Sequence, residues 1–133
     1  MFGACKCGSI QFTTSNPLQL VNCHCTLCRS INGTAFTSYV VTQLAELKLQ
    51  SGEERLSAYS ATNNAIKHFC SICGTPIYNS NATKYPGLAM VYLGTLTDHV
   101  EMQPGLNLYS SSKLGWVDAV SSIHSFDEAP QRN

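Results

Sequence analysis

The stretches Cys5-Lys6-Cys7-Gly8 and Cys70-Ser71-Ile72-Cys73-Gly74 decide the fold of this chain. Each places two cysteines two or three residues apart and ends in Cys-Gly. Glycine readily adopts a positive φ, which lets the backbone fold its N–H groups toward the sulfurs. Four thiolates from two such turns give a closed tetrahedral Zn²⁺ shell, with Zn–S near ~2.3 Å. We therefore expect Cys5, Cys7, Cys70 and Cys73 to bind one structural zinc.

A second group of cysteines, Cys23, Cys25 and Cys28, has no fourth cysteine left to join it, because the chain contains 7. Three protein ligands leave one position of a zinc ion open for water, a thiol or a carbonyl oxygen. An open position is typical of catalytic zinc. We therefore expect these three residues to be catalytic zinc ligands. We also expect this second ion to be labile, so that the site is easily emptied.

Other interpretations of the cysteines are open at this point. His24 could close the second site as a Cys₃His shell, although in an extended segment its side chain would point away from Cys23 and Cys25. A disulfide framework is disfavoured by the odd count and by the tight spacing. A redox pair of Cys25 and Cys28 lacks the βαβ setting of thioredoxin-like motifs. If residues 25–30 form a helical turn, Cys28 lies near its positive end, which would lower the thiol pKa.

Composition excludes several classes of partner. The 8 Lys+Arg balance the 8 Asp+Glu, whereas binding to nucleic acid or to an anionic membrane needs surplus positive charge. No apolar run is long enough to span a bilayer. The start, Met1 to Cys5, has neither the basic nor the apolar region of a secretion signal. We expect no nucleic-acid or membrane partner and a reducing compartment, the cytoplasm, in which cysteines bind metal.

Most of the chain has the residue pattern of short β-strands. Turn residues separate these runs, and helical signal is scarce. We expect strands at 9–13, 34–41, 47–49, 56–59, 66–69, 77–78, 88–93 and 106–109. No repeat or linker interrupts residues 1–133, so we predict a mainly β single domain held together by zinc.

Four segments resemble the glutathione-dependent formaldehyde-activating (GFA) family, also called the CENP-V/GFA domain. They are Gly3–Phe12, Cys23–Arg29, Phe69–Gly74 and Ser112–Trp116. The resemblance spans about residues 3–128 and implies an Mss4-like fold of strongly bent antiparallel sheets. It implies the same division into four structural and three catalytic cysteines. It also implies a carbon–sulfur lyase that condenses formaldehyde with glutathione to S-(hydroxymethyl)glutathione, or cleaves that adduct.

The chain departs from the family pattern at Asn107, where many members have histidine. Asparagine cannot shuttle a proton, so a histidine-dependent step would fall to water or to another group. The substrate we expect is therefore a thiol–aldehyde adduct, either that of glutathione or a related one. Arg29 follows the second cysteine group directly and is a candidate contact for a substrate carboxylate. The alternative function is a non-catalytic Mss4-like zinc module that binds a protein partner.

The only tryptophan, Trp116, is expected to anchor the core, since large aromatic residues usually do so in small β domains. Contact with a ligand is the alternative for this residue. Trp116 ends the segment Ser112–Trp116, which is one of the four segments that resemble the family.

Overall fold

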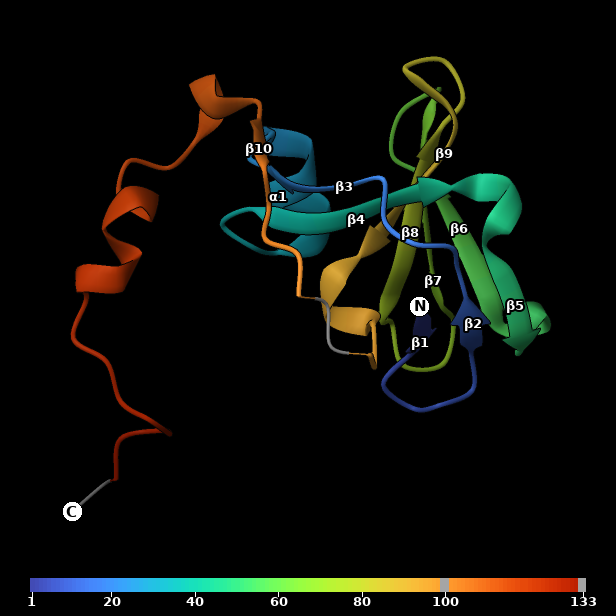
Figure 1. The fold of residues 1–133 in the computed structure, drawn as a ribbon, viewed down its shortest axis with the longest axis horizontal. Coiled ribbons are helices and arrows are strands. Elements are labelled where there is room, and N and C mark those ends of the chain that lie inside the picture. The colour runs from blue at the N-terminus through green and yellow to red at the C-terminus, as the bar shows by residue number, and fades with distance from the viewer. Residues whose placement is uncertain (99–100, 132–133) are drawn as a thin grey trace.

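The computed structural model describes residues 1–98 and 101–131. Within these residues the chain forms mainly short strands joined by turns (Figure 1). The strands are β1 (Phe2–Ala4), β2 (Gln11–Thr13), β3 (Gln19–Cys23), β4 (Thr37–Gln43), β5 (Lys48–Ser51), β6 (Leu56–Ser60), β7 (Ala65–Cys70), β8 (Pro76–Asn81), β9 (Tyr85–Tyr92) and β10 (Leu106–Leu108). The α-helix is α1 (Thr26–Asn32), and the 3₁₀ turns are η1 (Leu44–Glu46), η2 (Glu53–Arg55), η3 (Leu93–Thr95), η4 (Ser110–Ser112) and η5 (Val117–Ser122). The prediction of a mainly β fold is confirmed.

The described strands form two sheets. The smaller has the order β1-β2-β5 and the larger the order β10-β3-β4-β9-β8-β7-β6. All neighbours pair antiparallel except β10 and β3, which run parallel. In Figure 1, β3 and β4 run across the view while β6, β7 and β8 run steeply down it, so the larger sheet is bent.

The main core joins apolar side chains of both sheets. Phe12 of the smaller sheet packs with Leu20, Val40, Ile77 and Val91 of the larger one, and all five are buried. The strand β4, which lies inside the larger sheet, is made mostly of β-branched and aromatic residues, which pack well on a pleated surface. Burial of this apolar area is the main favourable contribution to folding.

A second, smaller core lies where β3, β4 and β9 meet α1. Its buried residues are Val21, Cys23, Cys28, Tyr39, Val41 and Tyr92. Sulfur and phenol groups make up most of this cluster, so it is more polar than the main core. Buried polar side chains need hydrogen-bond partners, and these partners hold the side chains in fixed orientations.

The segment after β10 leaves the body of the molecule and runs along its outside (Figure 1). Trp116 in this segment is 52% exposed, so the expectation that it anchors the core is wrong. The reason is that residues 109–131 form only short 3₁₀ turns and pair with no further strand. No helix within the described residues has both the length and the apolar character needed to cross a membrane.

Candidate functional site

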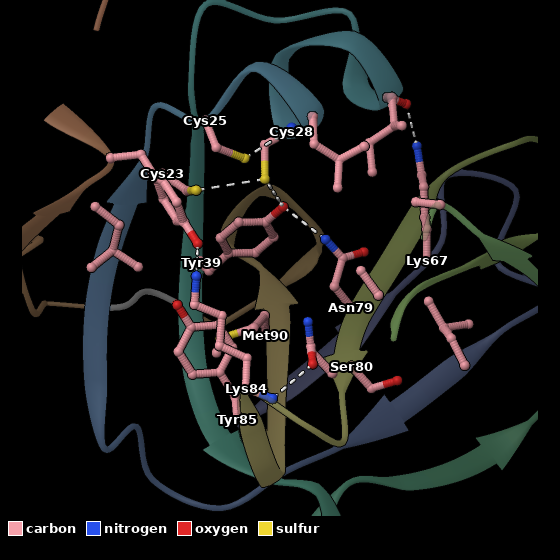
Figure 2. Close-up of a pocket in the computed structure, with 18 of the residues that line it drawn as sticks. Cys23, Cys25, Cys28, Tyr39, Lys67, Asn79, Ser80, Lys84, Tyr85 and Met90 are labelled. Atoms are coloured by element: carbon pink, nitrogen blue, oxygen red, sulfur yellow. Dashed lines mark hydrogen bonds between the residues drawn. The ribbon is translucent and has the colours of Figure 1, made fainter. Parts of the chain in front are cut away.

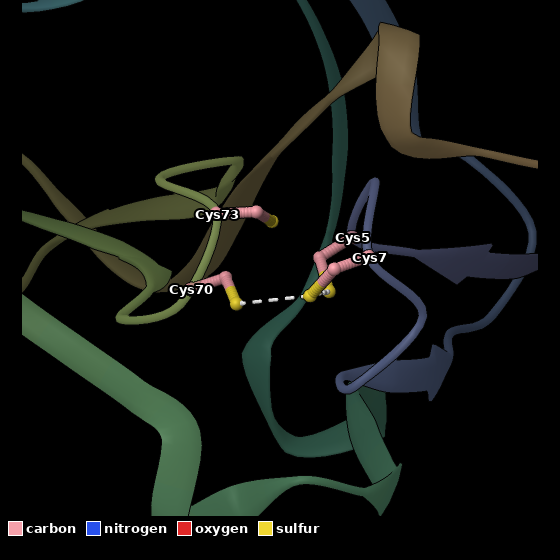
Figure 3. Close-up of side chains that lie close together, drawn as sticks. All are labelled: Cys5, Cys7, Cys70 and Cys73. Atoms are coloured by element: carbon pink, nitrogen blue, oxygen red, sulfur yellow. Dashed lines mark hydrogen bonds between the residues drawn. The ribbon is translucent and has the colours of Figure 1, made fainter.

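Four cysteines from two separate loops lie side by side and form the four-cysteine cluster. Cys5 and Cys7 come from the loop between β1 and β2, Cys70 ends β7, and Cys73 lies in the turn between β7 and β8 (Figure 3). Their sulfurs all lie within 4.8 Å of one another. The Cys5–Cys7 Sγ distance is 3.5 Å and the Cys7–Cys70 distance is 3.9 Å. A tetrahedral ion with Zn–S near ~2.3 Å needs sulfurs about 3.8 Å apart, so this donor set fits zinc.

Matching turns bring the four sulfurs together. Gly8 and Gly74, which follow Cys7 and Cys73, have φ values of 77° and 74°. Their N–H groups donate to the carbonyls of Cys5 and Cys70 at 3.0 and 2.9 Å. A side chain is disfavoured at such φ values, which explains the glycine after each second cysteine.

The protonation of this cluster depends on burial and on neighbouring hydroxyls. Burial raises the pKa of Cys5 to about 11. The hydroxyl of Thr75 holds the pKa of Cys73 at about 5. A divalent cation binds thiolates and displaces the protons of the remaining thiols.

The other three cysteines form the three-cysteine cluster at the start of α1. Cys23 ends β3, Cys25 precedes the helix and Cys28 lies in its first turn (Figure 2). The Sγ of Cys25 accepts a hydrogen bond from the N–H of Cys28 at 3.1 Å, so a cysteine caps the helix. The three sulfurs lie within 4.8 Å of one another, and Cys23 and Cys28 are 3.6 Å apart. These distances also fit a zinc ion.

The expected lowering of the Cys28 pKa is wrong for the metal-free cluster. The hydrogen bond that Cys28 donates to Cys23 raises the pKa of Cys28, and burial raises it further. The same hydrogen bond lowers the pKa of Cys23 to about 6. This local hydrogen bond and the burial of Cys28 outweigh the partial positive charge of a short helix.

A network of phenol and amide groups supports Cys28 from below. The hydroxyl of Tyr39 lies 3.5 Å from the Cys28 sulfur and accepts a hydrogen bond from Asn79 at 2.8 Å. The Tyr92 hydroxyl donates to the side-chain oxygens of Asn32 and Asn79 at 2.9 and 3.0 Å. Because its oxygen accepts from Asn79, Tyr39 directs its hydrogen at the sulfur. This network fixes the orientation of Cys28.

His24 does not join the three cysteines. Its buried ring packs against Phe36, with 5.1 Å between ring centroids, and its Nε2 lies 3.0 Å from Oδ1 of Asn107. Alternation along the end of β3 places it on the face opposite Cys23. The side chain of Asn107 is thus occupied by its hydrogen bond with His24. Neither residue lines the cavity described below.

Arg29 joins α1 to the segment after β10. Its Nη1 donates to the carbonyl oxygens of Ser112 and of His24. Arg29 is not part of the cavity wall, and contact with a substrate carboxylate stays a prediction for this residue.

A cavity of about 120 Å³ opens directly beside the three-cysteine cluster (Figure 2). Most of its wall is apolar. Lysine, tyrosine, asparagine and serine side chains supply the polar part, and the described wall contains no carboxylate and no imidazole. The lining residues are Val21, Cys23, Cys25, Leu27, Cys28, Ile31, Tyr39, Ala61, Ala65, Ile66, Lys67, Asn79, Ser80, Asn81, Lys84, Tyr85, Met90, Leu108 and Tyr109. An apolar wall with a few directed polar groups is typical of a small-molecule site.

Apart from the three cysteines, sequence reasoning missed the residues of this wall, and Tyr39, Lys84 and Tyr109 matter most among them. Tyr39 lies on a strand, where core packing is the default interpretation of a tyrosine. Lys84 and Tyr109 come from loops that are 25 positions apart, and no spacing signal links them. The asparagine at position 107 was the only hint that another polar group serves this site.

The fold and the two cysteine clusters define a mainly β protein that could hold two metal ions. Residues 1–112 match the family model described as "glutathione-dependent formaldehyde-activating enzyme". The match covers most of the chain, and the protein belongs to this family.

A solved structure shares the fold of this chain. It is the crystal structure of a Rhodobacter sphaeroides protein determined as a structural genomics target. The two have 21% sequence identity and a TM-score of 0.63, and the similarity covers 80% of this chain and 99% of the other. At this identity the likeness supports the fold alone. No curated protein matches the chain.

Proposed function

We propose that the protein is a zinc-dependent enzyme of the carbon–sulfur lyase type that forms or cleaves a thiol–aldehyde adduct. The observation that carries the proposal is the convergence of Cys23, Cys25 and Cys28 at the wall of an apolar cavity. S-(hydroxymethyl)glutathione is the adduct that membership of the family suggests. We expect the enzyme to work in a reducing compartment such as the cytoplasm, where its cysteines stay free to bind metal.

The two clusters have different roles in this proposal. The four-cysteine cluster would hold a structural zinc, because four thiolates leave no position for a substrate. The three-cysteine cluster would hold the catalytic zinc, which supplies a Lewis acid that favours the thiolate form of a thiol at neutral pH. Tyr39 orients Cys28, and the apolar wall keeps bulk water from the adduct.

The charge of the cavity supports an anionic thiol as the substrate. Lys67 and Lys84 line it, and its described wall has no acidic residue. Glutathione carries two carboxylates, and an ammonium group at the edge of a cavity attracts such groups. Lys67 donates to the carbonyl of Ile31 at 2.7 Å and Lys84 donates to the hydroxyl of Tyr109, and each ammonium keeps further N–H groups for a carboxylate. Arg29 is a second proposed carboxylate contact.

The test is an exchange measurement on the zinc-loaded protein. Uncatalysed addition is fast, so NMR exchange rates between ¹³C-formaldehyde plus glutathione and their adduct are the quantity to measure. We expect wild type to speed the exchange and Cys28→Ser to abolish the gain. Ser30→Ala, an exposed change in the same helix, should have no effect.

If the exchange rate stays unchanged across a panel of small thiols and aldehydes, the proposal that the protein is an enzyme is wrong. In that case the alternative function, a non-catalytic zinc module that binds a protein partner, replaces the enzyme proposal. A wild-type effect with another thiol only would keep the reaction class and replace glutathione as the substrate.

A further inference from the structure

Tyr109 has an unusual backbone conformation at the edge of the cavity. Its φ of 56° and ψ of 45° lie in the left-handed region, and among the described residues it is the non-glycine residue with positive φ. The preceding residue, Leu108, lies beside Cys23 in the parallel register of β10 and β3. In a continued strand, successive side chains would point to opposite faces. The left-handed turn breaks this alternation, and both Leu108 and Tyr109 line the cavity.

Lys84 holds the hydroxyl of Tyr109. It lies in the hairpin between β8 and β9, and its Nζ donates a hydrogen bond to Oη of Tyr109. Figure 2 shows the Lys84 side chain at the side of the cavity wall that carries Cys23. An ammonium group can only donate. The Tyr109 oxygen is therefore the acceptor, and its own hydrogen is left for an acceptor inside the cavity.

The ammonium form of Lys84 is the form that can donate the hydrogen bond to Tyr109. Its hydrogen bond to Tyr109 raises the pKa of Lys84, and the charge of Cys23 acts in the same direction. The group therefore stays an ammonium at neutral pH. Lys84 also lies 5.9 Å from the ring centre of Tyr85, which helps to hold the side chain in place.

Several other polar groups of the wall already have partners. The Tyr39 hydroxyl is directed at Cys28, and the Lys67 ammonium at the carbonyl of Ile31. The Ser80 hydroxyl pairs with Nε2 of His68 at 3.2 Å. Asn107 faces His24 and not the cavity. Tyr85 and Tyr109 are the remaining tyrosines of the wall, and Lys84 holds the hydroxyl of Tyr109.

We propose that Tyr109 is a catalytic residue that gives a proton to the oxygen of the thiol–aldehyde adduct, with Lys84 as its positioning residue. This inference rests on the proposed function. As the adduct forms, the sulfur lone pair makes the C–S bond and the C=O π pair moves onto oxygen. That oxygen takes the Tyr109 proton. Solvent, which received the proton of the thiol, returns one to Tyr109, so nothing is oxidised or reduced. Cleavage runs through the reverse steps.

The kinetic test compares variants that change a single group. Loss of a general acid costs typically 10²-fold or more, so Tyr109→Phe should lower kcat for adduct exchange about 100-fold with KM little changed. Lys84→Met should also lower kcat, and Lys84→Arg should recover part of the loss because it restores a donor. Tyr59→Phe, an exposed change at a residue that is not part of the wall, is the matched control. Zinc content and Tm should equal those of wild type in every variant.

Binding of stable analogues gives a readout besides activity. S-(2-hydroxyethyl)glutathione has a hydroxyl that S-ethylglutathione lacks. We expect calorimetry to show wild type binding the hydroxyl compound about fivefold more tightly, as one net hydrogen bond permits. Tyr109→Phe should remove this preference.

The outcomes separate the two proposals. If wild type speeds exchange and Tyr109→Phe does so equally, Tyr109 is not the donor and the proposed function stands. A larger loss of kcat in Tyr85→Phe than in Tyr109→Phe also overturns the assignment, because Tyr85 lines the same wall. If wild type does not speed the exchange, the proposed function is wrong, and the role inferred for Tyr109 is then wrong as well.

Discussion

Individual cysteines of the four-cysteine cluster differ in burial although they offer the same ligand atom. Cys5 and Cys70 are buried, whereas Cys7 and Cys73 are exposed. An exposed cysteine without a metal contributes little to stability, because substitutions on the surface usually change the free energy of unfolding only slightly. The exposure of Cys73 therefore predicts that its substitution changes the free energy of unfolding only slightly, whereas a role in binding a structural metal predicts a large loss.

We predict that Cys73→Ser destabilises the protein far more than Cys28→Ser, although Cys28 is the buried residue of the two. A structural zinc contributes on the order of 10 kcal/mol to folding in zinc-finger peptides. Loss of one of its four ligands should remove several kcal/mol of that contribution. Cys5→Ser should behave as Cys73→Ser does. Thermal unfolding of the zinc-loaded variants measures the difference.

The control for this comparison is the same set of variants unfolded in chelator. Without metal, Cys73→Ser should match wild type, because the exposed thiol then has little effect. Equal thermal stability of the three zinc-loaded variants would contradict the division into structural and catalytic clusters.

The elements of this fold are short and depend on particular end residues. The helix α1 spans seven residues, capped by the Cys25 sulfur at its start and by Gly33, with φ of 60°, at its end. Such a short helix is marginal by itself. Its position comes from the packing of Cys28 and from the Lys67 hydrogen bond to Ile31.

Gly52, between β5 and η2, illustrates how a turn limits the sequence. Its φ is 78°, and a Cβ there would overlap the carbonyl oxygen of Ser9. Gly87 in β9 has a similar φ of 73° with nothing within 4 Å of a Cβ. We predict that Gly87→Ala costs roughly 1–2 kcal/mol from backbone conformation alone. Gly52→Ala should cost an additional ~1–3 kcal/mol, because it also displaces backbone.

Urea unfolding of both glycine variants measures this difference. Gly94→Ala is the control, since that position has neither a positive φ nor a close neighbour. Equal losses for Gly52→Ala and Gly87→Ala would show that the backbone at Ser9 moves away from Gly52 at little cost.

At the scale of the whole molecule, the four-cysteine cluster connects the two sheets. Its first loop follows β1 of the smaller sheet, and its second follows β7 of the larger one (Figure 3). The three-cysteine cluster lies within the larger sheet and α1 alone. Loss of metal from the first cluster therefore affects the joining of the sheets, and loss from the second affects only the cavity.

We predict that the protein releases two zinc ions in two separate phases when a chelator is added. The ion of the three-cysteine cluster should leave first, because an open coordination position lets the chelator attack. The slow phase should coincide with unfolding. A metal-sensitive dye and circular dichroism, recorded together, measure both events.

Cys28→Ser is the control for this experiment, and it should keep the slow phase and lose the fast one. Release of both ions in a single phase that coincides with unfolding would contradict unequal sites.

Sequence spacing was enough to group the cysteines and to predict most strands, because knuckle turns and strand alternation are local. The sequence also allowed a helical turn at residues 25–30, and α1 begins there. The strands β1 and β3 were not, since β1 has only three residues and β3 ends in the cysteine group that we interpreted as a metal motif. Their strand form depends on pairing with β2 and β4.

The amino-acid sequence by itself determined the family, the mainly β class and the two cysteine clusters. Only the tertiary structure decided what surrounds the three cysteines: Tyr39 beneath Cys28, Asn107 turned to His24, and the pairing of Lys84 with Tyr109. These contacts join positions that are 11 to 83 residues apart. They depend on strand register and on one left-handed residue, and neither is encoded in the spacing of nearby residues.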